Sequence, residues 1–258
     1  MNMPDTILKL ARFHDGPEIF YTIQGEGRHV GRPSVFVRAS LCNLHCHWCD
    51  TDYTWNWEGT RFEHANDAMP GYAKYTKSEW IHEISSDDLA QQIAMAYPCR
   101  NIVLTGGEPL LQQEGFAALM RAMKAMDDGY FFEVETNGTL APDPDFDRLI
   151  GHYNVSPKLA NSRNEQQLRE RPAALLFFAK SEKAYFKFVI AEKEDLGETL
   201  AICSRYGIPT YKIWLMPEGR SKEALQQRRL WLVEACKQHG FNYSDRLHIQ
   251  VWGDRRGV

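Results

Sequence analysis

Three cysteines lie within eight residues of this chain, in the segment Cys42-Asn-Leu-His-Cys46-His-Trp-Cys49. Thiolates with a C-x3-C-x2-C spacing can bind one face of a metal centre, and soft sulfur ligands select zinc or an iron–sulfur cluster. A structural zinc site needs a fourth ligand and is usually built from two cysteine pairs, so a lone triplet argues against it. The neighbouring His45 and His47 keep zinc open as an alternative. A site with three protein ligands is more typical of catalysis, because one coordination position stays available.

The other three of the six cysteines are isolated along the 258 residues and have no ligand spacing. We predict that Cys99, Cys203 and Cys236 are small core residues. A secreted disulfide scaffold is short and dense in cysteine throughout, which this chain is not. The first twenty residues lack an apolar stretch long enough for a secretory signal, and no run approaches about 18 apolar residues. We therefore expect a cytoplasmic protein with no membrane span.

Composition excludes an intrinsically disordered chain and argues against a protein that coats nucleic acid. Aromatic residues make up 12% of the chain and charged residues 25%, a globular composition that can bury enough apolar area to offset chain entropy. The formal net charge is −4, whereas proteins that coat nucleic acid normally carry a basic excess. The sequence therefore favours a folded protein that handles small molecules and does not bind nucleic acid directly.

Apolar runs that alternate with helical patterns must position the cysteines. The alternation predicts an α/β fold, one domain over residues 1–258, with a parallel sheet that is open or curled into a partial or full barrel. Residues 56–86 fit no regular pattern and are expected to form an insertion or lid. The predicted strands are 34–39, 101–105, 130–135, 153–156, 185–190 and 210–215, and the predicted helices are 87–97, 112–126, 144–150, 195–206 and 222–239.

Several informative segments follow these strands, where sheets of this kind carry their chemistry. The cysteine triplet follows the first strand, and Leu104-Thr-Gly-Gly-Glu-Pro109 ends the second. Two glycines allow close backbone approach, and a carboxylate beside strand-end carbonyls suits an ammonium group. Taken alone, this segment could be a simple β-turn. Together with the triplet it resembles the radical S-adenosylmethionine (SAM) superfamily, which implies a partial (β/α)6 TIM-like barrel, a 4Fe-4S cluster and SAM.

A narrower resemblance spans residues 21 to 258. The segments that carry it are Tyr21-Thr-Ile-Gln-Gly-Glu-Gly27, Phe36-Val-Arg38, Cys49-Asp-Thr51, Glu135-Thr-Asn-Gly138, Ser156-Pro-Lys158 and Trp252-Gly-Asp-Arg-Arg-Gly-Val258. They resemble the 7-carboxy-7-deazaguanine synthase family, carbon–nitrogen lyases of queuosine and related deazapurine biosynthesis. The resemblance implies radical ring contraction of 6-carboxy-5,6,7,8-tetrahydropterin with loss of ammonia. It also implies that SAM acts as a catalytic cofactor, with the radical chemistry belonging to the cofactor and orientation to the protein.

The resemblance assigns residues to the cofactors. It makes Cys42, Cys46 and Cys49 the cluster ligands and Thr51 a contact of Mg²⁺, an ion that favours oxygen ligands and keeps several waters. The residues that it places at SAM are Trp48, Asp50, Gly107, Ser156, Pro157, Lys158, Leu215, Met216, Pro217 and Glu218. Trp48 could also simply pack beside the cluster, and the match at 215–218 depends mostly on order along the chain.

The resemblance also assigns residues to the pterin substrate: Ile23, Gln24, Gly25, Arg38, Thr105 and the C-terminal Val258. The guanidinium fork of Arg38 suits a carboxylate or carbonyl, although an arginine at a strand end often only reaches solvent. The carboxylate of Val258 is expected to fold into the site. Glu135 and Lys187 are charges that are costly to bury unpaired, so they could face the cofactor or each other. His248 could approach substrate or be a core histidine.

Two other functions stay open on these residues. A radical SAM activase of a glycyl-radical enzyme would share the cysteine triplet, but the Gln24-Gly-Glu-Gly27 loop, Thr51 and the C-terminal segment favour the pterin enzyme. A noncatalytic zinc or RNA-binding module would contain zinc and no iron, and the negative net charge disfavours RNA. The family resemblance further implies a flavodoxin or ferredoxin reductant and a homodimer.

Overall fold

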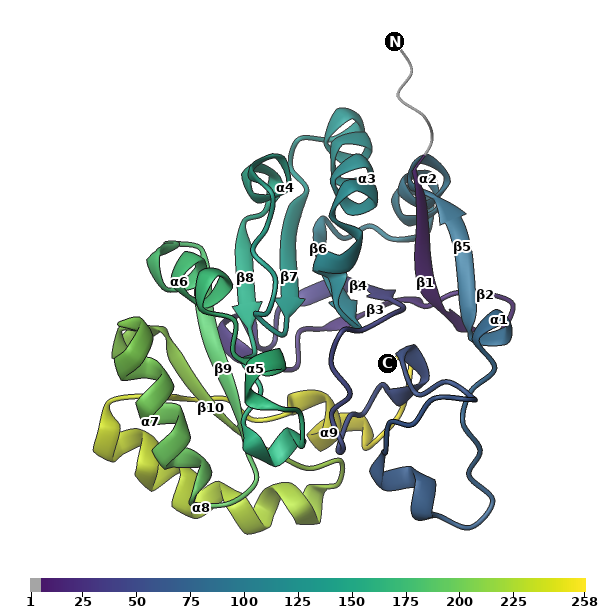
Figure 1. Ribbon diagram of the computed structural model, residues 1–258. Coiled ribbons are helices and arrows are strands. Elements are labelled where there is room, and N and C mark those ends of the chain that lie inside the picture. Colours follow the sequence, from purple (N-terminus) through teal and green to yellow (C-terminus); the bar gives the residue numbers. More distant parts are fainter. Residues whose placement is uncertain (1–5) are drawn as a thin grey trace. The chain divides into compact units, whose positions relative to one another are not determined.

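The computed structural model describes residues 6–258, which form two compact units. Unit 1 comprises residues 6–21, Ser34–Glu135 and Pro142–Gly151, and unit 2 comprises Thr22–Pro33, Thr136–Ala141 and His152–Val258. The predicted domain starts at residue 1, and residues 1–5 lie outside the described chain. Each unit has strands and helices of its own (Figure 1).

Unit 1 contains a mixed sheet. The strands β4 (Pro33–Ala39), β6 (Asn101–Gly106) and β7 (Phe131–Thr136) run parallel, with Val35 opposite Ile102 and Ile102 opposite Phe132. On the other side of β4, β1 (Ile7–Phe13) pairs antiparallel with β4, with β2 (Gly16–Pro17) and with β5 (Ile81–Ser85). Helix α3 (Gln113–Met126) packs against α2 (Ser86–Ala96) and α4 (Pro144–Leu149).

Unit 2 contains a parallel sheet. Its strands are β8 (His152–Val155), β9 (Ala184–Ile190), β10 (Ile213–Pro217) and β11 (Asn242–Tyr243), paired in that order. Helices α6 (Pro172–Lys180) and α7 (Asp195–Tyr206) pack on β9, and α8 (Lys222–His239) packs on β10 and β11. The smaller elements are β3 (Ile19–Ile23), α1 (Lys77–Trp80), α5 (Gln166–Arg169), α9 (Leu247–Trp252) and 3-10 helices at Gly27–His29, Asp52–Thr54, Ala65–Ala68, Pro109–Gln112, Ala160–Ser162 and Thr210–Lys212.

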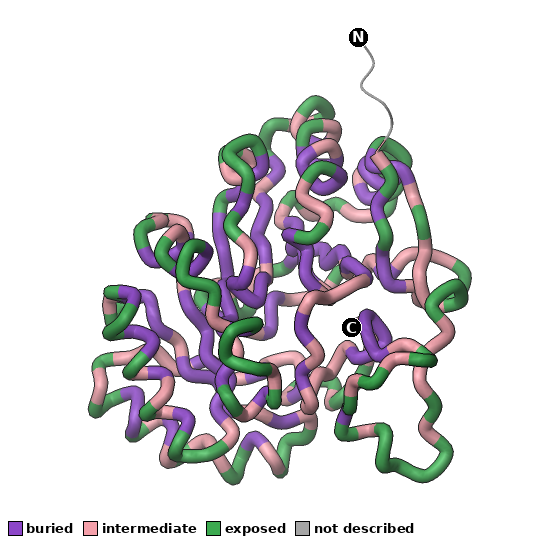
Figure 2. Tube along the Cα trace, in the orientation of Figure 1, coloured by how far each residue is buried: buried purple, intermediate pink, exposed green. Residues whose placement is uncertain are grey.

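Each sheet is the centre of a core of its own. In unit 1, Val35, Leu104 and Phe132 on neighbouring strands are fully buried, as is Phe116 of α3. In unit 2, β9 is buried at every position but Tyr185, and α8 covers β10 with Leu225 and Leu232. Figure 2 shows mostly buried strands and helices that expose one face. This pattern fits strands whose side chains are apolar along most of their length.

The six predicted strands are all present, with bounds shifted by one to three residues. The largest shift is at 210–215, where Thr210–Lys212 is a 3-10 helix and β10 begins at Ile213. The last part of the predicted insertion, residues 56–86, contains α1 and β5, and β5 pairs with β1. Directly before the C-terminal segment, Leu247–Trp252 forms helix α9, which is not among the predicted helices. In the described residues, no helix combines the length and the apolar character that a membrane crossing requires.

Candidate active site

The cysteine loop, residues 42–49, follows β4 in unit 1 and starts from a strained residue. Leu41 has φ +72°, in the left-handed region that non-glycine residues rarely adopt. Its N–H donates to the Thr54 carbonyl at 3.0 Å, and its carbonyl accepts the Glu108 N–H at 2.8 Å. Contacts from both sides therefore hold a conformation that is unfavourable in isolation, and they fix the position at which Cys42 begins the loop.

The turn after β6 packs against Leu41, at the start of the cysteine loop. A Cβ atom on Gly107 would lie 2.0 Å from the Leu41 carbonyl oxygen, so only glycine permits the observed approach. The Gly107 N–H donates to the Ala39 carbonyl at 3.0 Å. The Glu108 carboxylate is fully buried and accepts the Leu110 N–H at 3.0 Å, so it stabilises its own turn. Gly107, predicted to contact SAM, thus also positions the cysteine loop.

The three thiols fit a cluster better than a single zinc ion. All three are free, with Cys46 buried and the other two half-buried. A zinc ion with Zn–S bonds of about 2.3 Å would bring its sulfurs to within about 3.8 Å of one another. In the described chain, the sulfurs of Cys42, Cys46 and Cys49 do not all lie within 4.8 Å of each other. A cubane cluster spreads its cysteine ligands over different irons and accommodates this wider spacing.

Burial raises the pKa of Cys42 and of Cys49, so each thiol would release a proton on binding iron. The indole N–H of Trp55 is buried with no partner at hydrogen-bond distance in the described chain. The indole nevertheless lies near enough to the Cys49 thiol to oppose part of the rise in its pKa. A donor in this position suits negatively charged sulfur, and the donor set therefore fits an iron–sulfur cluster.

Arg38, predicted to meet the substrate, is held by a buried carboxylate that the sequence did not reveal. Its Nε donates to Glu18 Oε1 at 2.9 Å, and the Tyr53 hydroxyl donates to the same oxygen at 3.2 Å. The Glu18 side chain is fully buried. Burial lowers the pKa of Arg38, but Tyr53 and Glu18 outweigh it and the net shift is upward, so the guanidinium stays charged. The hydrogen bond to Glu18 therefore fixes the orientation of the Arg38 guanidinium.

Other predicted residues of unit 1 lie close to these groups. Thr51 Oγ1 is 3.5 Å from the Cys49 sulfur, beside a cluster ligand. The Thr105 hydroxyl donates to Glu135 Oε2 at 2.7 Å, which gives Glu135 a partner that the sequence left open. Trp48 and Asp50 are half-buried within or directly after the cysteine loop. Within unit 1, these predicted residues therefore lie on or beside the cysteine loop and at the end of β6.

In unit 2, the predicted substrate loop at Ile23–Gly25 is closely packed. Gln24 is buried, and its side-chain oxygen accepts the Glu26 N–H at 3.2 Å. The Gly25 carbonyl accepts the Leu247 N–H at 2.9 Å. A Cβ atom on Gly25 would lie 2.1 Å from His248 Nδ1, which explains the glycine. The loop and the start of α9 therefore form one structure.

A charge cluster on this loop was missed at the sequence level. Glu26 forms ion pairs with Lys187 and, at 2.8 Å, with Arg246, while His248 Nε2 lies 3.9 Å away. Burial raises the pKa of Glu26, but Lys187, Arg246 and His248 outweigh it and hold that pKa well below its usual range. The buried charge of Lys187 is therefore compensated by Glu26. His248 is one-quarter exposed and is not a fully buried core residue.

The remaining predicted residues of unit 2 are ordered. Lys158 Nζ donates to Ser156 Oγ at 3.0 Å, so the residues on either side of Pro157 are hydrogen-bonded to each other. Leu215, Met216 and Pro217 are buried in β10, and the Glu218 N–H donates to the Ile190 carbonyl at 2.8 Å. Arg220 Nε donates to Asp254 Oδ2 at 2.9 Å. Asp254 lies four residues before Val258, which is half-buried. The C-terminal segment is thus anchored within unit 2.

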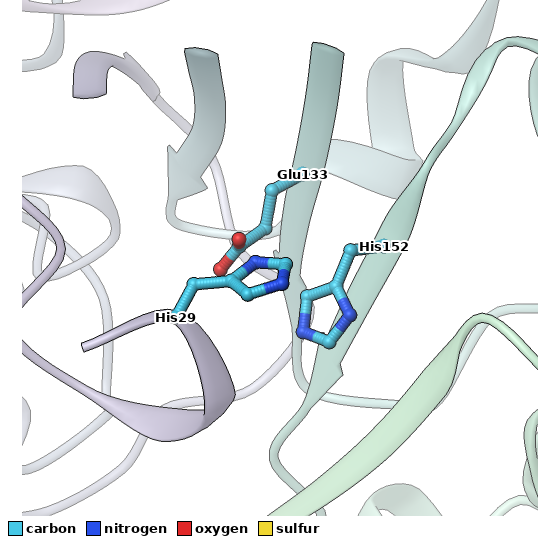
Figure 3. Close-up of side chains that lie close together, drawn as sticks. All are labelled: His29, Glu133 and His152. Atoms are coloured by element: carbon cyan, nitrogen blue, oxygen red, sulfur yellow. The ribbon is translucent and has the colours of Figure 1, made fainter. Parts of the chain in front are cut away.

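A histidine pair in unit 2 has a structural explanation. The rings of His29 and His152 lie 4.3 Å apart between centroids (Figure 3), and His152 also stacks on Tyr185. Burial, and then the charges of His29, Arg28 and Arg32, lower the pKa of His152 to about 3. His152 is therefore neutral at physiological pH and packs as an aromatic ring.

Comparison with known proteins gives one family. The model of the radical SAM superfamily matches residues 37–226. A 7-carboxy-7-deazaguanine synthase from Pyrobaculum aerophilum is 37% identical over 93% of this chain and 95% of that protein. The enzyme of the same name from Halobacterium salinarum is 33% identical over 93% of both chains.

The crystal structure of QueE from Escherichia coli shares the fold, with a TM-score of 0.61 and 24% sequence identity over 94% of this chain and 95% of that chain. The six strands predicted from the sequence run parallel, three in each unit. Together these findings confirm the predicted fold class, an α/β partial (β/α)6 barrel of the radical SAM type.

Proposed function

The chain belongs to the radical SAM superfamily and, within it, to the 7-carboxy-7-deazaguanine synthase family, and from this premise we propose that it converts 6-carboxy-5,6,7,8-tetrahydropterin to 7-carboxy-7-deazaguanine. The reaction is a ring contraction with loss of ammonia, in which SAM is used catalytically. The observation that carries the proposal is the loop of three free thiols held by the glycine turn after β6.

The cofactors of this superfamily are a 4Fe-4S cluster and SAM. We assign the cluster to Cys42, Cys46 and Cys49. When bound, the reduced cluster and SAM supply the 5′-deoxyadenosyl radical that takes hydrogen from C6 of the pterin. The residues proposed to hold SAM are Trp48, Asp50 and Gly107 in unit 1, and Ser156–Lys158 and Leu215–Glu218 in unit 2. Because Leu215 is fully buried in its core, it can contribute only backbone atoms.

Binding of the substrate is assigned to groups whose orientation is fixed. Arg38, held by Glu18, offers a permanent positive charge to the pterin carboxylate. Thr105, held by Glu135, offers a hydroxyl oxygen. Fixed partners reduce the conformational freedom that these side chains lose on binding, which favours a precise position of C6. We add Ile23, Gln24, Gly25 and the carboxylate of Val258 as contacts of the pterin.

Three features of the proposal, the Mg²⁺ contact, the reductant and the homodimer, are carried over from the family resemblance. Thr51 is proposed to hold Mg²⁺ through its hydroxyl, beside Cys49. Electrons are proposed to come from a flavodoxin or ferredoxin. We also propose a homodimer and a cytoplasmic enzyme. The single domain with an insertion remains our proposal for the domain organisation.

The proposal is tested by anaerobic reconstitution with iron and sulfide, reduction, and incubation with SAM, the tetrahydropterin and Mg²⁺, followed by mass spectrometry. We expect 7-carboxy-7-deazaguanine from the wild type and none from Cys46→Ser, which removes one ligand. A colourless protein with one zinc and no iron would overturn the radical assignment. An iron–sulfur protein that forms no deazapurine, with or without Mg²⁺, would overturn the substrate assignment.

A further inference from the structure

Residues 57–75 form a closed loop within unit 1. Its two ends meet in a bridge between Trp57 and Tyr75, where the Glu58 N–H donates to the Tyr75 carbonyl at 3.0 Å. Inside the loop, the Lys74 ammonium donates to the carbonyls of Thr60, at 3.1 Å, and Phe62. These bonds give the loop a defined conformation, although it contains only one short 3-10 helix. From the sequence, this segment is expected only to be part of an insertion or lid.

The closed loop contacts the cysteine loop at three alternate residues. The Phe62 ring stacks on His45, with centroids 3.4 Å apart and planes inclined by 6°. The Ala65 N–H donates to the His47 carbonyl at 2.8 Å. His64 Nε2 lies 2.8 Å from the carbonyl oxygen of Cys49, a proposed cluster ligand. The closed loop therefore supports the cysteine loop along its second half.

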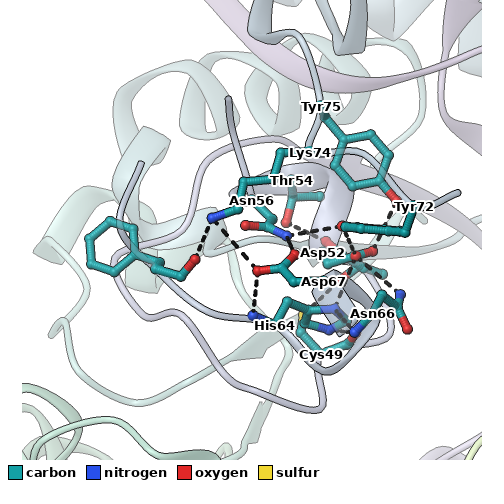
Figure 4. A network of polar contacts seen from close by, with 12 residues as sticks. Cys49, Asp52, Thr54, Asn56, His64, Asn66, Asp67, Tyr72, Lys74 and Tyr75 are labelled. Carbon is teal, nitrogen blue, oxygen red and sulfur yellow. Dashed lines mark hydrogen bonds and ion pairs between the residues drawn. The ribbon is translucent and has the colours of Figure 1, made fainter. Parts of the chain in front are cut away.

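A second anchor lies at Asp52, directly after Thr51. Its buried carboxylate accepts the Tyr72 hydroxyl at 2.6 Å and the Tyr75 hydroxyl at 3.3 Å, and Asn66 Nδ2 donates to it at 3.3 Å (Figure 4). All three donors belong to the closed loop. Asp52 thereby ties the segment that follows the cluster ligands to the same element that holds the Cys49 carbonyl.

His64 connects the two anchors, and its side chain is only 1% exposed. Nε2 must carry a hydrogen, because the Cys49 carbonyl can only accept. Nδ1 is 3.1 Å from the Asn66 N–H and 3.2 Å from Asp52 Oδ2. In the neutral ring, Nδ1 accepts the N–H; in a charged ring, it would donate to Asp52. The bond to Cys49 is the same in both states.

We propose that the closed loop positions the iron–sulfur cluster and that His64 is the positioning residue, through its hydrogen bond to the Cys49 carbonyl. The inference rests on the proposed function, since it assumes a cluster on the three cysteines. Hydrogen bonds from outside the ligand set orient the ligands, and removing such a partner typically lowers metal affinity or activity by about 10- to 100-fold. The bond orders the Cys49 peptide before iron arrives, so less conformational freedom is lost on binding.

Two substitutions separate this role from simple packing. His64→Gln keeps an amide N–H that can reach the Cys49 carbonyl, in place of Nε2, and loses the acceptor at Nδ1. His64→Asn keeps an acceptor for the Asn66 N–H, so the turn remains capped, and loses the donor to Cys49. Thr76→Val is the matched control, because it removes a hydrogen bond to Glu58 in the same insertion, away from the cysteine loop.

The first readout is the rate at which an iron chelator strips the reconstituted cluster. We expect about a 10-fold faster loss from His64→Asn and a change of no more than about 2-fold in His64→Gln and Thr76→Val. The second readout is hydrogen exchange in metal-free protein, where peptides covering residues 45–52 should exchange faster in His64→Asn alone. The electron paramagnetic resonance signal of the reduced cluster should change in His64→Asn and be restored in His64→Gln.

Equal iron loss from the two His64 variants would overturn the proposal, whether both match the wild type or both are faster. Equal melting temperatures of the variants would show that the comparison reports on the loop and not on unfolding. None of the three readouts requires the pterin. A wild-type protein that retains iron but makes no deazapurine would therefore overturn the substrate assignment and leave the role of His64 standing.

Discussion

Gly107→Ala is the substitution whose effect follows most directly from the geometry. The added methyl would lie 2.0 Å from the Leu41 carbonyl oxygen and 2.6 Å from its carbon, whereas ordinary contact begins at 3.4 Å. The turn and Leu41 must therefore separate by about 1.4 Å. The Glu108 N–H bond to Leu41, now 2.8 Å, would break at that separation.

The magnitude has two parts. Leaving a buried backbone group without its partner costs about 1–3 kcal/mol, and crowding costs a similar amount. We expect a loss of about 2–5 kcal/mol in the free energy of unfolding, because the two effects overlap. Cys42 follows Leu41 directly, so its sulfur moves too. A displacement of about 1 Å can lower turnover about 100-fold, and iron content should fall with it.

The assay measures unfolding in urea, iron per chain after reconstitution and the initial rate of deazapurine formation. Gly197→Ala in α7 is the control, because nothing lies within 4 Å of the added methyl. Alanine in a helix should leave iron and turnover unchanged and raise stability by up to about 1 kcal/mol. Wild-type iron content and turnover in Gly107→Ala would refute the account of how the cysteine loop is held.

Three further outcomes are expected. Arg38→Met removes the guanidinium that pairs with the buried Glu18 carboxylate, whose Oε1 also accepts the Tyr53 hydroxyl, so the free energy of unfolding measured in urea should fall by about 3–5 kcal/mol. The double variant with Glu18→Gln should recover part of the loss, and no recovery would contradict the pairing. The pKa of His152 is lowered from 6.5 to about 3, so its ring is neutral in both the folded and the unfolded protein above pH 6.5. As the pH falls from 6.5 toward 3, only the unfolded protein takes up the proton, and the free energy of unfolding should drop by about 1.5–2 kcal/mol at pH 5. His152→Phe should show a flatter dependence of stability on pH, and parallel curves for variant and wild type would refute this. A C-terminal extension should lower turnover more than an N-terminal extension of equal length, because Val258 is assigned to the pterin and Asp254 anchors its segment; equal activities would count against that role.

The parallel strands could be predicted from the sequence because each is a short apolar run bounded by turn residues. The run at 185–190 contains a single charge, Lys187, which was expected to face the cofactor or Glu135 and pairs with Glu26 in the structure. Its partner could not be inferred, since Glu26 lies 161 residues away. The pairing of β1 with β5 was missed for the same reason, because its partners are far apart in sequence.

The site could be predicted where spacing or motif carries the signal, as in the cysteine loop and the turn after β6. The groups that hold those residues carry no such signal. Glu18 follows a proline in an unremarkable stretch, and His64 lies in a segment with no periodicity. Their importance comes from hydrogen bonds to Arg38 and to the Cys49 carbonyl, which only the folded chain reveals.

The most direct test of the central claim follows a label from the substrate into the cofactor. The reconstituted, reduced enzyme is incubated with tetrahydropterin that carries deuterium at C6, and both the deazapurine product and recovered SAM are analysed by mass spectrometry. The account predicts deuterium in recovered SAM, product in excess over any SAM consumed, and no label transfer with Cys46→Ser. Product without deuterium in SAM would contradict radical abstraction at C6 by this site.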